Sequence, residues 1–418
     1  MFRVIDSRTT AKPTLWLTPR RLRVHGLILA LCLWCTYAWI FATPGLRDRN
    51  GAVKGADFLH YYTLGWLALE HRGADLYDMP AQTVLAQQRV PEAGPLVFVP
   101  LYGPQVSLLF APLSALPYRW ALFLWLLLNA AVYALCCYAV WKTCPHLRCQ
   151  GSAVFILALA HPAFFHLIAW GQTSVIALAC FTAAYLALRS GRMFSAGLAI
   201  GCLIFKPQLG LAAAFVFLLA REWEIVVGAI AAGLAQLSVG WFYYRTSVMR
   251  DYLQHLIQVR GVFPQLEPRP YQMHSLRSFW AMLIPWPHAS FGIYVATALA
   301  VLAIALLSWK SSAPLSLRFS GLLIATVLVS PHLTVYDLVI LAPAFLLLAD
   351  WAVANSASLG RRVGVLLYVS YALPLIGPLS HWTHLQLSVL AMAALLWTIV
   401  RAAECTAGAR RLQSVTET

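Results

Sequence analysis

The chain has little charge, and acidic residues are its scarcest component. Only 15 of its 418 residues are Asp or Glu, and the four charged residue types together make up 11%, whereas a typical soluble protein has about 25%. A soluble surface built from this composition would lack charge over most of its area. Since 61% of the residues are hydrophobic and many apolar runs approach the length that crosses about 30 Å of hydrocarbon, the composition predicts an all-α, polytopic membrane protein.

Further absences exclude several classes of function. No Asp-x-Asp cluster is present to hold a metal ion and a nucleotide diphosphate. The cysteine pairs Cys32/Cys35 and Cys144/Cys149 have no second pair at zinc spacing. The formal net charge is +15, but no basic face is interleaved with aromatic residues, so we expect no nucleic acid partner. We predict no cofactor and assign no metal ligands, although the sequence leaves a divalent metal ion open.

Basic residues predict the topology, because Lys and Arg collect on cytoplasmic loops. Residues 1–24 hold six basic residues against one acid, which predicts a cytoplasmic N-terminus. We expect a transmembrane domain over residues 25–402, with about 11–13 membrane segments, and a cytoplasmic tail over residues 403–418. The basic turns place two long loops, residues 44–102 and 245–291, on the exterior side. These basic turns therefore predict an integral multi-pass protein whose basic loops lie on the cytoplasmic side of the membrane.

Two segments of the chain are expected not to cross the membrane. Residues 57–71 are aromatic and amphipathic, which predicts a helix lying in the interface. Residues 103–117 are short, flanked by proline and interrupted by Pro112, which predicts a re-entrant helix.

Several polar groups fall at the ends of apolar segments that are predicted to face the exterior. A charged side chain at membrane depth costs several kcal/mol and is a functional candidate by default. The residues are Asp57, Gln172, Lys206, His332 and Asp337. Their convergence beneath an exterior loop predicts a cavity that opens at the interface and suits a substrate with a lipid tail and a polar head.

Three of these residues have two interpretations each. Asp57 can cap the helix that follows it, or it can act as a general base with a pKa raised by partial burial. Lys206 can extend its ammonium to the interface, or bind phosphate at a helix break. His332 can be a satisfied helix-end histidine or a hydrogen-bond donor to phosphate.

An ordered set of short motifs spans residues 50 to 350. The motifs are Gly55-Ala56-Asp57-Phe58 with Tyr61-Tyr62, Leu76-Tyr77-Asp78, Tyr102-Gly103-Pro104 through Phe110-Ala111-Pro112-Leu113, Gly171-Gln172-Thr173, Lys206-Pro207-Gln208, and Ser330-Pro331-His332 through Tyr336-Asp337-Leu338. Each motif alone is weak, but together they resemble glycosyltransferase family 87, a group of bacterial polyprenyl-phosphate-mannose-dependent α-mannosyltransferases. Two departures are Val99-Pro100-Leu101-Tyr102, where the family often has a Tyr-Pro-Pro run, and Ser174, near a position where Asn is common.

The resemblance implies a GT-C fold, an active site on the periplasmic side and a polyprenyl-phosphate sugar as donor. The sugar would be a hexose, with mannose as the first expectation, and the acceptor a lipid or a glycan. The family's catalytic aspartate falls on Asp57, which would deprotonate the acceptor so that the anomeric carbon inverts. The expected phosphate-binding residues are Lys206, His332, Arg269 and Arg277. The expected substrate-binding residues are Tyr61, Gln172, Gln208, His274, Tyr336 and Asp337.

A transporter or flippase of lipid-linked sugars is the alternative, because it would also be polytopic and basic. Such a protein typically has inverted repeats and polar groups near the middle of the bilayer. Here the polar groups are predicted to cluster toward one end of the segments, which favours the enzyme.

Overall fold

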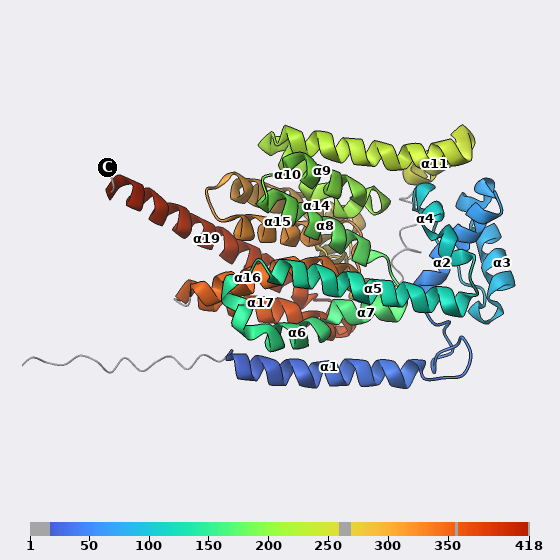
Figure 1. The fold of residues 1–418 in the computed structure, drawn as a ribbon, viewed down its shortest axis with the longest axis horizontal. Helices are drawn as coiled ribbons and strands as arrows, with labels where there is room; N and C mark the ends of the chain where they lie inside the picture. The colour runs from blue at the N-terminus through green and yellow to red at the C-terminus, as the bar shows by residue number, and fades with distance from the viewer. Residues whose placement is uncertain (1–16, 259–268, 356–357, 417–418) are drawn as a thin grey trace, which may run out of the picture.

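The computed structural model describes residues 17–258, 269–355 and 358–416, and its regular structure is helical (Figure 1). Within these ranges, extended pairing is limited to two isolated bridges, Arg47 with Val53 and Met273 with Thr334. Part of the predicted N-terminus (residues 1–16), part of the second loop (259–268) and the end of the tail (417–418) lie outside the described residues.

Seven helical segments in the described ranges are long and apolar enough to cross a membrane. They are α1 (Pro19–Phe41), α5 (Tyr118–Trp141), α11 (Trp223–Gln258), α14 (Pro287–Lys310), Val335–Ala354 with η8 and α16, Leu359–Thr383 with α17 to α18, and Leu387–Glu404 in α19. An eighth span results if Pro145–Leu159 and Pro162–Trp170, which are bent by 44° at their junction, count as one. These helices confirm the predicted polytopic helical fold.

Shorter apolar helices fill the bundle between the long ones. They are α4 (Gln105–Ser114), α8 (Ser174–Arg189), α9 with η4 (Met193–Phe205), α10 (Leu211–Ala220) and α15 (Leu315–Val329). At 1.5 Å per residue, each is shorter than the roughly 30 Å of a hydrocarbon layer. The length of α4 agrees with the prediction that residues 103–117 do not cross.

The first long loop folds into helices at one end of the bundle. These are α2 (Ala56–Leu69), η1 (Gly73–Tyr77), α3 (Met79–Arg89) and η2 (Pro91–Ala93). In Figure 1 they lie at the end opposite the start of α1 and the end of α19. Tyr244, Val248 and Tyr252 of α11 pack into the same apolar cluster as Leu64 and Tyr77. Both long loops therefore contribute to one end of the molecule, and the side of the membrane that this end faces stays a prediction.

The interfacial interpretation of residues 57–71 is wrong. Ten of the 14 residues of α2 are buried, and they include every position from Phe58 to Gly65. A helix lying on a membrane would leave one face to lipid or water, whereas Leu69 is the one exposed residue of α2. Gly65 permits this packing, because a Cβ there would lie 2.7 Å from the carbonyl oxygen of Phe110 in α4.

The second predicted loop is shorter than expected at its start. Residues 245–258 continue α11 after a break at Arg245, where φ is 69° and ψ is −176°. Beyond the undescribed residues, η7 (Pro270–Gln272) and α13 (Leu276–Leu283) lead into α14. Apolar and aromatic side chains in 245–258 pack against the first loop, which is why this part is helical rather than irregular.

Candidate active site

Asp57 lies in the first turn of α2, but it does not cap the helix. The N-cap is Gly55, in the left-handed region at φ 69°, with no side-chain cap hydrogen bond. The carboxylate of Asp57 instead accepts a hydrogen bond from Gln172 Nε2 at 2.6 Å. The capping interpretation of Asp57 is therefore wrong, although its negative charge is still favoured by the dipole at the helix N-terminus.

Gln172 connects Asp57 to the rest of a polar network. It follows Gly171, the left-handed C-cap of α7 (Pro162–Trp170). Its Oε1 accepts hydrogen bonds from Tyr61 Oη at 2.9 Å and from the Thr173 amide at 3.1 Å. It also accepts one from Lys206 Nζ at 3.3 Å. One amide side chain thus links the first long loop to two other hairpins.

Lys206 is held in a buried ion pair with Asp337. The distance from Lys206 Nζ to Asp337 Oδ1 is 3.0 Å, and the two residues are 5% and 1% exposed. The ammonium also donates to Ser174 Oγ at 3.0 Å, and Ser174 Oγ donates to Asp337 Oδ1 at 2.5 Å. An extension of Lys206 to the interface is therefore wrong. With Gln172 included, all three N–H donors of the lysine are used.

Asp337 is fixed from its other side by the segment before η8 (Val335–Leu341). Its Oδ2 accepts hydrogen bonds from the Thr334 amide at 3.2 Å and from Thr334 Oγ1 at 3.1 Å. The neighbouring Tyr336 presents its ring to Lys206, with Nζ 5.3 Å from the ring centroid. Such a contact stabilises the ammonium further.

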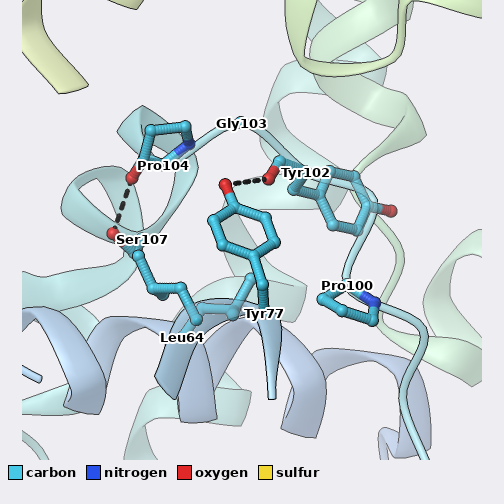
Figure 2. A pocket seen from close by; sticks show the side chains of 8 residues that line it. Leu64, Tyr77, Pro100, Tyr102, Gly103, Pro104 and Ser107 are labelled. Carbon is cyan, nitrogen blue, oxygen red and sulfur yellow. Dashed lines mark hydrogen bonds between the residues drawn. The ribbon is translucent and has the colours of Figure 1, made fainter. Parts of the chain in front are cut away.

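Two tyrosines extend the network toward the start of α4. The hydroxyls of Tyr61 and Tyr102 are hydrogen-bonded to each other, and Thr173 Oγ1 donates to Tyr61 Oη at 3.1 Å. Figure 2 shows how the Tyr102 segment is held, because its carbonyl accepts from Tyr77 Oη at 3.0 Å. The cavity beside it is about 10 Å³, room for about one water molecule, so the segment is tightly packed.

Asp57 differs from the other two charged residues in its accessibility. It is half-buried, whereas Lys206 and Asp337 are buried. Burial of the carboxyl raises the pKa of Asp57 to about 6; the Gln172 hydrogen bond and the Lys206 charge act in the opposite direction. A reachable carboxylate with a pKa near neutrality is suited to general base catalysis.

Two of the predicted phosphate-binding residues lie beside this network. His332 is half-buried, and its charge acts on Asp337. Arg277 Nη1 donates to the carbonyl of Pro331 at 3.0 Å. Together they place two further basic groups at the Ser330–Pro331–His332 turn.

Three other predicted site residues take no part in the network among the described residues. Arg269 is exposed at the start of η7. His274 Nδ1 is hydrogen-bonded to Ser388 Oγ at 2.7 Å, so its imidazole fixes the loop before α13 to α19. Gln208 is half-buried in η5 (Pro207–Leu209), outside the hydrogen bonds described above.

Four network residues had no role assigned from the sequence: Tyr102, Thr173, Ser174 and Thr334. Each is adjacent to, or inside, a motif that the sequence does single out. A signal was therefore present, because a hydroxyl beside a predicted catalytic residue is a candidate partner for it. Within the described ranges, no three His, Cys, Asp or Glu residues form a group that could hold a metal ion.

Two of the comparisons with known proteins found a match. The model of glycosyltransferase family 87 matches residues 101–331, which include Gln172 and Lys206. A similar curated protein is the polyprenol-phosphate-mannose-dependent alpha-(1-2)-phosphatidylinositol pentamannoside mannosyltransferase of Mycolicibacterium smegmatis. It is 25% identical over 379 residues, covering 88% of this chain and 85% of the relative. The search of solved structures found no significant match.

Proposed function

The chain belongs to glycosyltransferase family 87 and is a membrane glycosyltransferase, and we propose that it transfers a hexose from a polyprenyl-phosphate sugar to a hydroxyl of an acceptor. One observation carries the mechanism. Asp57, Gln172, Lys206 and Asp337 come from four separate motifs and form one hydrogen-bonded network. Its half-buried member is a carboxylate with a raised pKa.

Asp57 acts as the general base in this proposal. It removes the proton from the acceptor hydroxyl as that oxygen attacks the anomeric carbon of the donor. The new C–O bond forms on the face opposite the phosphate, so the configuration inverts. The electron pair of the breaking C–O bond leaves with the polyprenyl phosphate, which is a stable anion and requires no general acid.

The departing phosphate needs positive charge near it. His332 and Arg277 supply it at the Ser330–Pro331–His332 turn, where neither is fully buried. Lys206 stabilises the phosphate through the electrostatic field of its ammonium rather than by a hydrogen bond, because its three N–H donors are occupied in this arrangement. Its positive charge acts across a partly dehydrated space, where electrostatic interactions are stronger than in water.

Tyr336, which is half-buried, provides aromatic surface for the donor sugar, and the buried Tyr61 and Gln172 hold Asp57 in place behind it. Mannose is the proposed sugar, because the relative's name specifies a polyprenol-phosphate-mannose donor. The same name specifies a glycolipid acceptor, which supports a lipid-linked glycan acceptor here. We place the reaction on the exterior side of the bacterial inner membrane, on the basis of the basic residues at the opposite ends of the spans.

A panel of donors tests the proposal. Purified protein is incubated with radiolabelled polyprenyl-phosphate mannose, glucose or arabinose and with extracted membrane lipids. Label should pass from polyprenyl-phosphate mannose to a glycolipid product. Movement of intact donor between leaflets with no product from any donor would support a transporter instead.

A further inference from the structure

Tyr102 is a half-buried hydroxyl residue at the edge of the Asp57 network. It is hydrogen-bonded to Tyr61, which is buried, as Gln172 and Thr173 are. Tyr102 and Asp57 are instead both partly exposed. The charge of Asp57 acts on the Tyr102 hydroxyl, so the two groups belong to the same part of the site. Tyr102 therefore keeps surface where the network can meet a substrate.

The orientation of the Gln172 amide follows from its partners. The atom that contacts the Thr173 amide and the Lys206 ammonium must be an oxygen, because both of these partners are donors. The other end of the amide must be the nitrogen, because it contacts the carboxylate of Asp57. Gln172 Oε1 therefore has no hydrogen to give to Tyr61 Oη, which lies 2.9 Å away.

This orientation determines the direction of each hydrogen bond that Tyr61 makes. A tyrosine hydroxyl has one hydrogen, and that of Tyr61 points to Gln172 Oε1. The Tyr61 oxygen accepts from Thr173 Oγ1 at 3.1 Å. In the hydrogen bond between Tyr61 and Tyr102, the donor must then be Tyr102. The hydroxyl hydrogen of Tyr102 is thereby committed to the network.

The oxygen of Tyr102 can consequently act toward a ligand only as a hydrogen-bond acceptor. No described residue donates a hydrogen bond to this oxygen, so it has a lone pair available. Phosphate oxygens are acceptors, and a sugar ring oxygen has no hydrogen either, whereas every sugar hydroxyl has one. The group that matches Tyr102 is thus a saccharide hydroxyl, and not the phosphate of the polyprenyl-phosphate sugar.

The segment that carries Tyr102 is fixed, although residues 94–104 form no helix or strand. The Phe98 ring stacks on that of His60, with 4.7 Å between the centroids. Tyr77 Oη donates to the Tyr102 carbonyl, and in Figure 2 the Tyr102 hydroxyl points away from Tyr77. The hydroxyl is therefore held in one position, which selection between the hydroxyls of one sugar requires.

Tyr336 indicates which sugar lies against Tyr102. Its half-buried ring is the aromatic surface proposed for the sugar of the polyprenyl-phosphate substrate, and it interacts electrostatically with Tyr102. Lys206 Nζ lies 5.3 Å from the centroid of the same ring and also acts on Tyr102. A hexose that packs on Tyr336 therefore brings its hydroxyls next to Tyr102.

We propose that Tyr102 binds the sugar of the polyprenyl-phosphate substrate by accepting a hydrogen bond from one of its hydroxyls. The assignment rests on the proposed hexose substrate. Tyr102 selects the sugar, while Asp57 performs the proton transfer. A substrate without this hydroxyl leaves the Tyr102 oxygen without its partner. A substrate with fluorine in its place does the same, because fluorine has no hydrogen to donate.

Binding of sugar analogues tests the assignment without turnover. Purified protein in nanodiscs, with no acceptor present, is titrated with polyprenyl-phosphate mannose and with its monodeoxy analogues, one for each sugar hydroxyl. The dissociation constants are measured by calorimetry. At one position, removal of the hydroxyl should weaken binding to the wild type about fivefold, as expected for one lost hydrogen bond. The same removal should have no effect on binding to Tyr102→Phe.

A fluoro analogue at that position tests the direction of the hydrogen bond. It should bind the wild type as weakly as the deoxy analogue does, because Tyr102 needs a ligand that donates. A sugar hydroxyl that only accepts from the protein would instead tolerate fluorine better than hydrogen. This measurement uses the wild type alone, so it decides the question even if Tyr102→Phe does not fold.

Two other tyrosine variants separate this contact from a structural role. Tyr77→Phe loosens the Tyr102 carbonyl and leaves the Tyr102 hydroxyl in place. It should therefore weaken binding of mannose and of every analogue by the same factor. Tyr138 is 51% exposed on α5, and Tyr138→Phe should bind all of them like the wild type.

Several results would overturn the assignment. The wild type discriminates against none of the deoxy analogues, or Tyr102→Phe discriminates among them as the wild type does. In another, the fluoro analogue binds as tightly as mannose. In the last, Tyr102→Phe binds mannose normally and raises only the amount of extracted lipid needed for half-maximal transfer, which would assign the hydroxyl to the acceptor.

Transfer of radiolabel, measured in parallel, keeps this assignment separate from the proposed function. If the wild type transfers no sugar but Tyr102→Phe still loses its selectivity for one hydroxyl, the sugar contact stands and the proposed function fails. If the wild type transfers mannose without selecting any hydroxyl through Tyr102, the proposed function stands and the contact fails.

Discussion

The two sides of α2 differ in how their polar side chains are connected to the rest of the molecule. On the Asp57 side, hydrogen bonds connect Asp57 through Gln172 and Lys206 to Asp337, so side chains from four motifs form one network. On the opposite side, Trp66 Nε1 is buried without a partner beside a cavity of about 710 Å³. One helix thus separates a continuous hydrogen-bonded network from a cavity that lies outside it.

This difference teaches which side of α2 can perform chemistry. Preorganised charges stabilise a transition state because they need no rearrangement during the reaction. The comparison predicts that variants on the Asp57 side change the rate or the fold, whereas variants on the opposite side have smaller effects.

Replacement of Asp57 by Asn should have the largest effect on the rate. The amide can still contact Gln172, so the fold is retained, but it cannot accept a proton. Transfer should fall more than about a hundredfold, as expected for loss of a general base. Transfer of radiolabel at saturating donor gives the measurement. Asp251→Asn, on α11, is the matched control, and near-normal turnover by Asp57→Asn would remove this residue from the catalytic role.

Lys206→Met should lower stability more than any other single change on the network side. It leaves Asp337, which is 1% exposed, as a buried carboxylate without its cation. Loss of one partner from a buried pair costs about 3–5 kcal/mol. Thermal unfolding in detergent should show the loss, and transfer should fall as well.

Two further variants show whether the lost stability comes from the unpaired carboxylate of Asp337. Lys142 is exposed at the C-cap of α5, and Lys142→Met should leave stability unchanged. The double variant Lys206→Met/Asp337→Leu removes both charges and should recover much of the stability without recovering transfer. If Lys206→Met is as stable as Lys142→Met, the ion pair contributes nothing to the fold.

The class of fold could be predicted from hydropathy, but the burial of α2 could not. Lipid permits only continuous apolar helices or closed barrels as spans, so α1, α5 and α14 are evident from the sequence. The α2 segment contains His60 and Thr63, which suggested a polar face. In the structure Thr63 Oγ1 donates to the carbonyl of Leu59 at 2.8 Å, and His60 stacks on Phe98. Burial of polar residues by local hydrogen bonds or ring stacking cannot be distinguished from solvent exposure by spacing alone.

The residues of the candidate site could be predicted from the sequence, but the contacts between them could not. Asp57, Gln172, Lys206 and Asp337 stand at the ends of apolar segments, where charge is expensive. The partnership of Lys206 with Asp337 joins residues 131 positions apart, and it depends on how the hairpins pack. The Trp66 cavity has no sequence signal, because its wall comes from segments that are separate along the chain.

The pH dependence of transfer should follow the state of Asp57. Its pKa is about 6, raised mainly by burial, and only the deprotonated form is a base. Transfer should therefore be half-maximal near pH 6 and fall about tenfold per pH unit below it. Gln172→Leu removes a hydrogen bond that lowers the pKa of Asp57, so this acid limb should move to higher pH. Gln208→Leu changes the same residue type outside the network, and an equal shift in both variants would contradict the assignment.

The smallest effect is expected where the two sides of α2 meet, at Tyr118. Tyr118→Phe keeps the ring in the cavity wall and removes the hydroxyl that donates to Lys54 and Gly55. Loss of these hydrogen bonds costs about 1 kcal/mol, which corresponds to a decrease of about fivefold in transfer if the turn carrying Asp57 shifts. Tyr133 is the matched control, since its hydroxyl donates to the carbonyl of Ala158 at 2.9 Å and Tyr133→Phe removes a similar bond away from α2. Transfer that is unchanged in Tyr118→Phe would show that the catalytic turn does not depend on the cavity wall, and the two sides of the helix would then act independently.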